Sequence, residues 1–289
     1  MKFITFSRGG QPSPGVWLGN GRIADLSGVA GSMIDLIGGG PEVMAAARRA
    51  AGDDAASLSA DGVELLAPIP WPRKNVFCVG RNYVDHVAEG ARAMGTATKL
   101  PEVPQFFTKA PTAVNAPGAP VRLDNALTKL LDYEVELAVV IGKAGRDIPA
   151  ARAYEHVFGY TIANDVTARD LQRRHDQWFK GKSLDTTLPL GPWIVDAEEI
   201  GDPTTLELSL TVNGEERQRA TASQMIFDIP AIIASLSAGM TLQPGDVIAT
   251  GTPSGVGFAM DPPQGLKDGD VVVARIDRIG ELVSPIKAV

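Results

Sequence analysis

The chain is poor in cysteine, in histidine and in clustered positive charge. Its 289 residues include one cysteine, three histidines and 27 Lys and Arg against 34 Asp and Glu, which gives a net charge of −7. A single cysteine excludes an intrachain disulfide framework. Because Cys78 lies in an apolar run over residues 76–79, we expect a buried, unreactive thiol. Without a basic stripe, nucleic acid and anionic membranes are poor partners for this chain.

Long hydrophobic runs are also absent from the sequence. No apolar stretch reaches the roughly 18 residues that cross a bilayer. Residues 1–8 are too short, and too soon interrupted by polar residues, for a signal peptide. A content of 44% hydrophobic and 21% charged residues is ordinary for a globular protein. We therefore expect a cytoplasmic enzyme with no membrane partner.

Turn residues divide the chain into two expected domains. Short β-like runs separated by Gly-Gly, Pro-Gly and Asn-Gly pairs, and a helix expected over 41–51, predict a small N-terminal α+β domain over residues 1–70. A proline-rich linker then leads to a mainly β domain over 74–289. Its expected strands are 76–79, 134–141, 160–163, 193–195, 206–212, 246–250 and 271–276. Its expected helices are 167–179 and 223–238, and 89–121 is expected to be a long lid or linker loop.

Three acids stand at the ends of two expected strands. Side chains alternate along a strand, so Glu134 and Glu136 point to the same face, where the strand enters an apolar core. Asp165 follows the strand over 160–163. Neighbouring carboxylates repel and resist desolvation unless a cation lies between them, and hard divalent ions prefer oxygen ligands. The alternatives are a solvated strand face for the glutamates and a helix cap for Asp165.

The expected helix over 167–179 carries two groups suited to an acidic substrate. Arg169 and Gln172 are three residues apart, so they share one side of the first turn and could grip a carboxylate. An ordinary surface pair is the alternative. Leu171, His175, Trp178 and Phe179 follow the spacing of a core-facing stripe, which makes His175 a packed histidine rather than a ligand.

A possible proton-transfer pair precedes the expected loop. His86 and Glu89 are three residues apart, so on a helical turn the carboxylate would orient the imidazole and share its proton. An ordinary pair on a surface helix is the alternative, because surface helices contain many.

Two further segments offer groups for an anionic substrate. One lysine of the pair Lys180 and Lys182 could stabilise developing negative charge on an oxo acid. The loop over residues 251–257 lacks the Gly-Lys-Ser/Thr ending of a phosphate loop. Backbone amides from Gly251 onward and the Thr252 hydroxyl are better suited to binding a carboxylate.

Five segments in order resemble the fumarylacetoacetate hydrolase superfamily. They are VGRNY at 79–83, DYEVEL at 132–137, NDVTARD at 164–170, GKS at 181–183 and TGTPSGVG at 250–257. The resemblance covers residues 74–287. It implies an α+β, mainly β fold, a mixed β-roll or sandwich with a small N-terminal domain, and a homodimer.

The resemblance also implies roles for the candidate residues. It implies Mg²⁺ or Mn²⁺ (Ca²⁺ in crystals) on Glu134, Glu136 and Asp165. It implies a small-molecule 2-oxo acid substrate in contact with Arg169, Gln172, Lys182, Gly251 and Thr252, and a water-activating dyad of His86 and Glu89, with Lys182 stabilising the enolate. The family often has Gln-x-x-Asn-Thr where this chain has residues 218–222, QRATA, so the distal end of the substrate stays open.

The reaction that this resemblance implies is cleavage beside a 2-oxo acid. The first expectation is hydrolysis of an acylpyruvate or fumarylpyruvate with release of pyruvate. Decarboxylation of oxaloacetate, and a lyase, isomerase or hydratase reaction of a related diacid, are the alternatives on the same metal site. A dyad of His86 and Glu89 favours hydrolysis or decarboxylation over tautomerisation. A non-enzymatic metal-binding protein is the remaining alternative.

Overall fold

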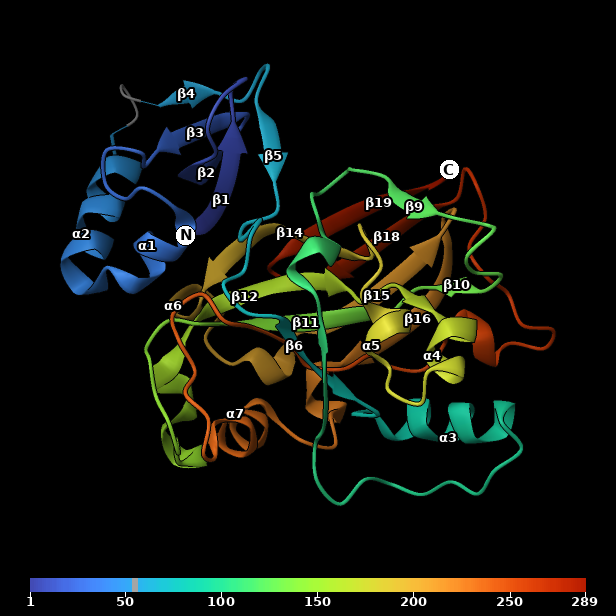
Figure 1. Ribbon diagram of the computed structural model, residues 1–289. Coiled ribbons are helices and arrows are strands. Elements are labelled where there is room, and N and C mark those ends of the chain that lie inside the picture. The colour runs from blue at the N-terminus through green and yellow to red at the C-terminus, as the bar shows by residue number, and fades with distance from the viewer. Residues whose placement is uncertain (54–56) are drawn as a thin grey trace.

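The structure is a computed structural model that describes residues 1–53 and 57–289 (Figure 1). Within these residues the largest sheet has twelve strands, in the order β4-β3-β2-β1-β14-β12-β11-β17-β6-β7, with β5 beside β1 and β8 beside β14. Its strands are β1 (Lys2–Ser7), β2 (Ser13–Gly19), β3 (Arg22–Asp25), β4 (Leu58–Ser59), β5 (Glu64–Leu66), β6 (Val76–Gly80), β7 (Gln105–Lys109), β8 (Val114–Asn115), β11 (Val135–Ile141), β12 (Val157–Asn164), β14 (Leu188–Asp196) and β17 (Val247–Ala249).

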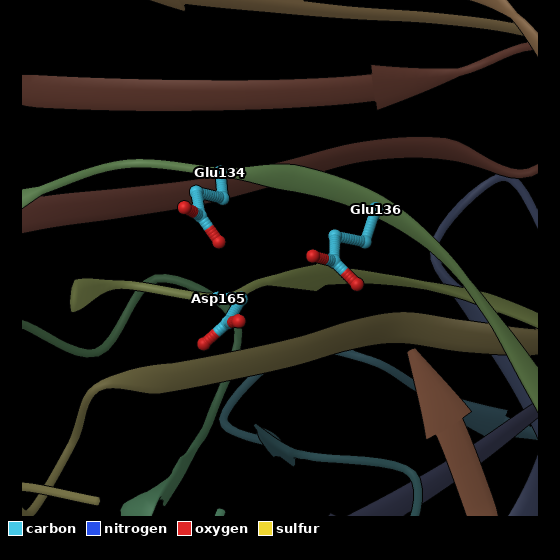
Figure 2. A group of neighbouring side chains, drawn as sticks. All are labelled: Glu134, Glu136 and Asp165. Atoms are coloured by element: carbon cyan, nitrogen blue, oxygen red, sulfur yellow. The ribbon is translucent and has the colours of Figure 1, made fainter. Parts of the chain in front are cut away.

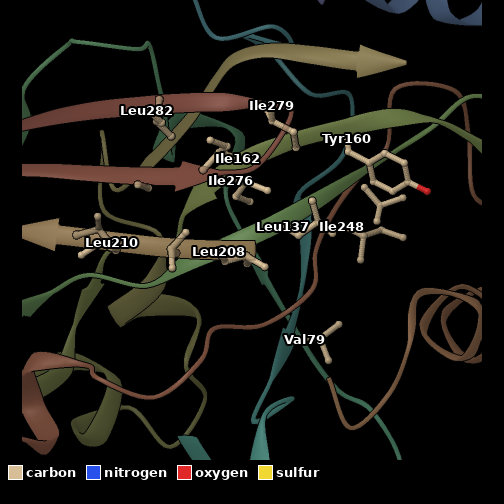
Figure 3. Close-up of a cluster of buried hydrophobic side chains, with 14 of the residues drawn as sticks. Val79, Leu137, Tyr160, Ile162, Leu208, Leu210, Ile248, Ile276, Ile279 and Leu282 are labelled. Carbon is tan, nitrogen blue, oxygen red and sulfur yellow. The ribbon is translucent and has the colours of Figure 1, made fainter. Parts of the chain in front are cut away.

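A second sheet of the described residues packs against the middle of the first. Its order is β16 (Glu215–Thr221), β15 (Glu207–Val212), β18 (Val271–Ile276), β19 (Gly280–Ala288) and β9 (Val121–Leu123). Leu137 and Ile162 of the large sheet share one buried cluster with Leu208 and Ile276 of the second sheet (Figure 3). β10 (Leu131–Asp132) and β13 (Thr167–Ala168) form a separate antiparallel pair among the described residues. The expected α+β, mainly β fold is confirmed.

Both faces of β11 are buried, as the apolar run at its end predicts. Leu137 and Val139 belong to the cluster between the two sheets, whereas Ala138 and Val140 belong to a second cluster on the opposite face. Alternate side chains of one strand thus contribute to two cores. A strand held on both faces is a rigid support for the glutamates at its beginning.

The N-terminal residues form an extension of the same sheet. β1 pairs with β14 through Lys2 opposite Val195 and Phe3 opposite Ile194. The helices α1 (Met33–Gly38) and α2 (Gly40–Ala51) lie with β1 to β4 in the blue part of Figure 1. α2 agrees with the helix expected over 41–51. The division into domains over 1–70 and 74–289 stays a prediction, and the pairing of β1 with β14 joins the two segments through backbone hydrogen bonds.

The prediction of a single helix over residues 167–179 is wrong. Thr167 and Ala168 are extended because β13 pairs with β10, and α4 (Arg169–Arg174) ends before Asp176, which has a positive φ of 44°. A separate turn, α5 (Phe179–Lys182), follows. Leu171 is buried, but His175 is exposed and Phe179 is 45% exposed, so the expected core-facing stripe does not form.

Two other expected segments differ from the structure. α7 (Ile229–Ser237) begins later than expected because Asp228 caps it, accepting from the Ala231 N–H, while the preceding η5 (Ala222–Gln224) is a separate 3₁₀ turn. The expected loop over 89–121 contains the end of α3 (Val84–Ala93), then β7 and β8.

The remaining short helices are η2 (Pro111–Ala113), η3 (Ala150–His156), α6 (Ala197–Ile200), η4 (Pro203–Thr205) and η6 (Gly257–Ala259). Among the described residues, none of the helices has the length and apolar character to cross a membrane.

Candidate active site

Pairing between β11 and β12 brings the three expected acids together. Val135 lies opposite Asn164, and the Asp165 N–H donates to the Glu134 carbonyl at 2.8 Å. One carboxylate oxygen from each of Glu134, Glu136 and Asp165 lies within 4.8 Å of the others, and all three residues are buried. Figure 2 shows Glu134 and Glu136 projecting from the same side of their segment toward Asp165. The alternation of side chains along a strand thus places the glutamates as expected.

Two of the three acids are neutralised by buried cations. Lys182 Nζ lies 2.6 Å from Glu134 Oε2 and 2.6 Å from Asp165 Oδ2. Arg169 Nη2 lies 2.6 Å from Glu134 Oε1, and Lys109 Nζ lies 2.7 Å from Asp165 Oδ1. Burial opposes the charge of Glu134, but the attraction of Lys182 and Arg169 outweighs it and lowers the pKa of this carboxyl well below its usual range. Glu134 is therefore ionised before any metal binds.

Glu136 differs from its neighbours because no described residue forms an ion pair with it. Its Oε2 accepts a hydrogen bond of 2.8 Å from the Gly251 N–H. Burial, followed by repulsion from Asp165 and Glu134, raises the pKa of Glu136 well above its usual value. Within this cluster, and with Glu136 ionised, the acids Asp132, Glu134, Glu136 and Asp165 outnumber the cations Lys109, Arg169 and Lys182 by one. The excess negative charge and three hard oxygen donors fit a divalent ion such as Mg²⁺ or Mn²⁺.

Arg169 and Lys182 are held firmly at the edge of the acid cluster. Arg169 Nε donates to Asp132 Oδ2 at 2.9 Å, and Asp132 in turn accepts from the backbone N–H groups of Gly257 and Phe258. Burial lowers the pKa of Lys182, but the attraction of Asp165 and Glu134 outweighs this effect. The pKa of Lys182 is therefore raised, and the ammonium stays charged. Gln172 Oε1 accepts from Arg169 Nη1 at 3.3 Å. Lys180 is exposed, which leaves Lys182 as the lysine of this site.

The expected dyad forms on α3. His86 Nδ1 lies 2.9 Å from Glu89 Oε1, and Glu89 Oε2 accepts from the Gly255 N–H at 2.9 Å. A carboxylate at Nδ1 places the proton on that nitrogen, which leaves Nε2 as the basic atom. His86 lines a cavity of about 380 Å³ that Glu134, Glu136, Arg169, Gln172, Lys182 and Thr252 also line. The dyad and the acid cluster therefore face the same space.

A buried glutamine supports the loop after β17. Gln218 Nε2 donates to Thr252 Oγ1 at 2.8 Å and to the Pro253 carbonyl at 2.9 Å, and its Oε1 accepts from the Val135 N–H. Gly251 has a φ of +104°, and a Cβ there would lie 2.7 Å from Asn82 Cβ, so only glycine fits. The Gly251 N–H binds Glu136 rather than facing the cavity. Gln218 belongs to the segment that departs from the family pattern, and it fixes Thr252.

Lys109 and Asp132 hold the site together through contacts that no local sequence pattern predicts. Lys109 is fully buried at the end of β7, in a segment expected to be a loop, and its Nζ also donates to the Val166 carbonyl at 2.9 Å. Burial lowers the pKa of Lys109, against the opposing attraction of Asp165. Asp132 begins the DYEVEL segment, but its partner Arg169 is 37 residues away.

Cys78 is buried, as the apolar run around it predicts, and burial raises the pKa of its thiol.

The fold, the acid triad and the neighbouring dyad together define an enzyme of the fumarylacetoacetate hydrolase class. The family model described as fumarylacetoacetate (FAA) hydrolase C-terminal matches residues 75–287, so the chain belongs to this family. The chain is 49% identical over 273 residues to oxaloacetate tautomerase YisK of Bacillus subtilis (strain 168), covering 92% of this chain and 89% of the relative.

Solved structures agree over the whole chain. Fumarylacetoacetate hydrolase from Exiguobacterium antarcticum is 42% identical, with a TM-score of 0.85 and 100% of both chains covered. Maleylpyruvate hydrolase from Sphingobium sp. SYK-6, in complex with manganese(II) and pyruvate, is 32% identical, with a TM-score of 0.81, covering 100% of this chain and 99% of that chain. These relatives support membership of a metal-binding enzyme family whose members carry different reaction names.

Proposed function

We propose that this protein is a divalent-metal-dependent tautomerase that interconverts the keto and enol forms of oxaloacetate. The observation that carries the proposal is the similarity to oxaloacetate tautomerases, which outweighs the preference for hydrolysis or decarboxylation that the dyad alone indicates. His86, which lines the same cavity as the metal-binding glutamates and has Glu89 at its Nδ1, would act as the base. Keto–enol exchange needs one proton moved between carbon 3 and the oxygen on carbon 2, and one oriented base can do this. The 49% identical Bacillus relative carries this activity in its name.

Three residues of this chain would bind the oxo-acid end of the substrate. A divalent ion held by Glu134, Glu136 and Asp165 would polarise the oxygen on carbon 2 and acidify the protons on carbon 3. Lys182 and Arg169 border the acid cluster and keep their positive charge, which suits them to the substrate carboxylate and to the developing negative oxygen. Thr252, fixed by Gln218, offers a hydroxyl to the same cavity.

His86 would then move the proton. In the keto-to-enol direction Nε2 takes a proton from carbon 3, and the positive charge on the ring is stabilised by Glu89. The same proton is delivered to the oxygen on carbon 2, so the enzyme returns to its starting state. The Gly255 N–H holds Glu89 in place, which keeps the ring from turning away.

Hydrolysis of an acylpyruvate to pyruvate is the second candidate function. It is favoured by the same dyad, because His86 could deprotonate a water molecule instead of a carbon, and by the similarity to a hydrolase whose structure contains manganese and pyruvate. Decarboxylation of oxaloacetate would use the metal site without water attack. Each of these reactions forms an enol of a 2-oxo acid, which the same cations stabilise.

We also propose that the protein is a homodimer, which light scattering coupled to size exclusion would test.

One experiment separates the candidates. Enol-form oxaloacetate prepared in dry solvent is diluted into buffer, and the loss of enol absorbance is followed with Mg²⁺, with Mn²⁺ and with chelator, while pyruvate is assayed in parallel. Metal-dependent acceleration without pyruvate supports the tautomerase. Pyruvate from acetylpyruvate or fumarylpyruvate would instead make the protein a hydrolase, and pyruvate from oxaloacetate alone would make it a decarboxylase.

A further inference from the structure

We propose that Arg81, Lys99 and Arg173 bind the second carboxylate of a short 2-oxo diacid, and that they make the cavity selective for diacids over monoacids. The proposal rests on the proposed function in one respect: it takes the acid triad to be the place where the oxo-acid end binds. It adds the residues that recognise the other end of the substrate.

The cavity has an inner zone of paired charges and an outer zone of unpaired positive charges. Five cationic residues line it, and the inner two, Arg169 and Lys182, contact Glu134. The outer three, Arg81, Lys99 and Arg173, form no ion pair with any carboxylate of the described residues. The acids that line the cavity, Glu134 and Glu136, belong to the inner zone. In a chain of net charge −7, three cations without an acid partner in the lining of one cavity indicate an anionic ligand.

Arg173 lies next to Arg169, the arginine that contacts Glu134 of the acid triad. It is four residues after Arg169, so both project from the same side of α4. Both guanidinium groups lie over the Phe258 ring, at 4.4 Å for Arg169 and 5.5 Å for Arg173 from the ring centre. Arg169 is neutralised by Glu134 and Asp132, whereas Arg173 is not. A carboxylate that extends from the acid cluster along Phe258 would meet the planar fork of Arg173.

Arg81 and Lys99 line the same cavity and are joined to each other. Arg81 directly follows β6 and has a positive φ of 56°, a conformation that costs energy for a residue with a side chain. Its Nη2 donates to the Lys99 carbonyl at 2.6 Å, which ties the segment between α3 and β7 to the strand end. This contact holds the Lys99 segment over the cavity. Arg81 is thus a positioning residue for Lys99 as well as a cation of the cavity lining.

The rest of the outer lining is mostly apolar, with Val87 and Ala91 buried and Met94 60% exposed. Val87, Ala91, Met94, Phe107 and Trp178 belong to it. A Cβ on Gly80 would lie 2.4 Å from the Trp178 ring, so the ring packs directly on the backbone at the end of β6. Arg173 and Lys99 are exposed and Arg81 is half-buried, so their attraction for a bound carboxylate should be sensitive to salt.

The test compares two ligands that differ only at the distal end. Oxaloacetate carries a carboxylate where 2-oxobutyrate carries a methyl group. Binding of each to the manganese-loaded protein is measured by competition with oxalate, which has no distal group, by calorimetry. We expect Arg173→Gln to lower the preference for the diacid over the monoacid by about tenfold to a hundredfold, the range for one charge-assisted hydrogen bond. Lys99→Gln should lower the same preference, and raised salt should lower it in the wild type.

Arg174→Gln is the matched control, because Arg174 is the neighbouring exposed arginine of α4 and does not line the cavity. Equal loss of diacid and monoacid binding in Arg173→Gln, or no change in either, overturns the inference. Oxalate affinity should be the same in wild type, Arg173→Gln and Arg174→Gln. If the wild type prefers the diacid through Arg173 but does not accelerate enol conversion, the proposed reaction fails while the diacid site stands.

Discussion

Lys182 Nζ lies 2.6 Å from Glu134 Oε2, and both side chains are buried at the edge of the candidate metal site. The ammonium thus neutralises a metal ligand and at the same time borders the cavity where substrate would bind. Because Lys182 also contacts Asp165, it keeps two acids of the triad in place. This double contact makes its removal a sharp test of the site.

Lys182→Met should destabilise the metal-free protein and abolish activity. Loss of one partner of a buried ion pair costs about 3–5 kcal/mol, because Glu134 and Asp165 would face each other without their shared cation. We expect added Mn²⁺ to recover more stability in the variant than in the wild type, since the ion replaces the missing charge. Thermal unfolding with and without Mn²⁺ measures both effects. Lys180→Met, at the exposed lysine two residues earlier, is the control; an equal loss there would contradict the assignment.

Glu136→Gln should weaken metal binding without destabilising the metal-free protein. The amide has the shape of the carboxyl but removes a charge that is buried beside Asp165 and Glu134 without a cation. We therefore expect Mn²⁺ affinity to fall by at least tenfold, while the free energy of unfolding of the metal-free protein near neutral pH is unchanged or larger. Calorimetric titration and denaturant unfolding give the two values. Glu281→Gln, an exposed glutamate of β19, should change neither, and a large loss of metal-free stability in Glu136→Gln would refute this account.

Metal affinity should rise with pH because Glu136 must give up its proton. Its pKa in the folded, metal-free protein is raised above the ordinary 4.5, so between these two values the folded protein holds a proton that the unfolded chain has lost. The metal-free protein therefore loses stability as pH rises through this window, and Mn²⁺ binding releases a proton there. Glu134, with its lowered pKa, contributes no proton in this range.

Calorimetry in two buffers of different ionisation enthalpy counts these released protons. We expect up to one per ion and an affinity gain of up to about tenfold per pH unit, until the pH exceeds the raised pKa. Binding without proton release, or affinity independent of pH, would show that Glu136 is ionised before the metal arrives.

Local sequence periodicity predicts the contacts at the centre of the site but not those around it. Glu134 and Glu136 share a face because a strand alternates, and His86 meets Glu89 because a helical turn brings them together, so both pairs follow from sequence spacing. Lys109 meets Asp165 across 56 residues, through the pairing of β7 with β6. No local pattern contains that contact.

The same limit explains the wrong helix and the second sheet. Residues 167–179 have helical spacing, but pairing of β13 with β10 fixes Thr167 and Ala168 as extended chain. β19, a nine-residue strand, was not expected, because its alternating burial places Ser284 inside and Val283 outside, opposite to their polarity. Its place is decided by β18 on one side and β9 on the other. Tertiary pairing here overrides local preference.

Glu89→Gln should slow the proton transfer and leave metal binding intact. The amide can no longer stabilise positive charge on the His86 ring. It also has only one acceptor oxygen for two donors, so if that oxygen accepts from the Gly255 N–H, the NH2 group faces Nδ1 and disfavours a proton there. We expect kcat to fall by about 10²-fold, in the range for loss of general acid–base catalysis, with KM within about threefold of the wild type. Mn²⁺ affinity should be unchanged because Glu89 belongs to the dyad and not to the triad. Asp85→Asn, on the same helix and exposed, is the control. A variant that keeps full kcat would remove Glu89 from the mechanism and leave His86 to act without a carboxylate partner.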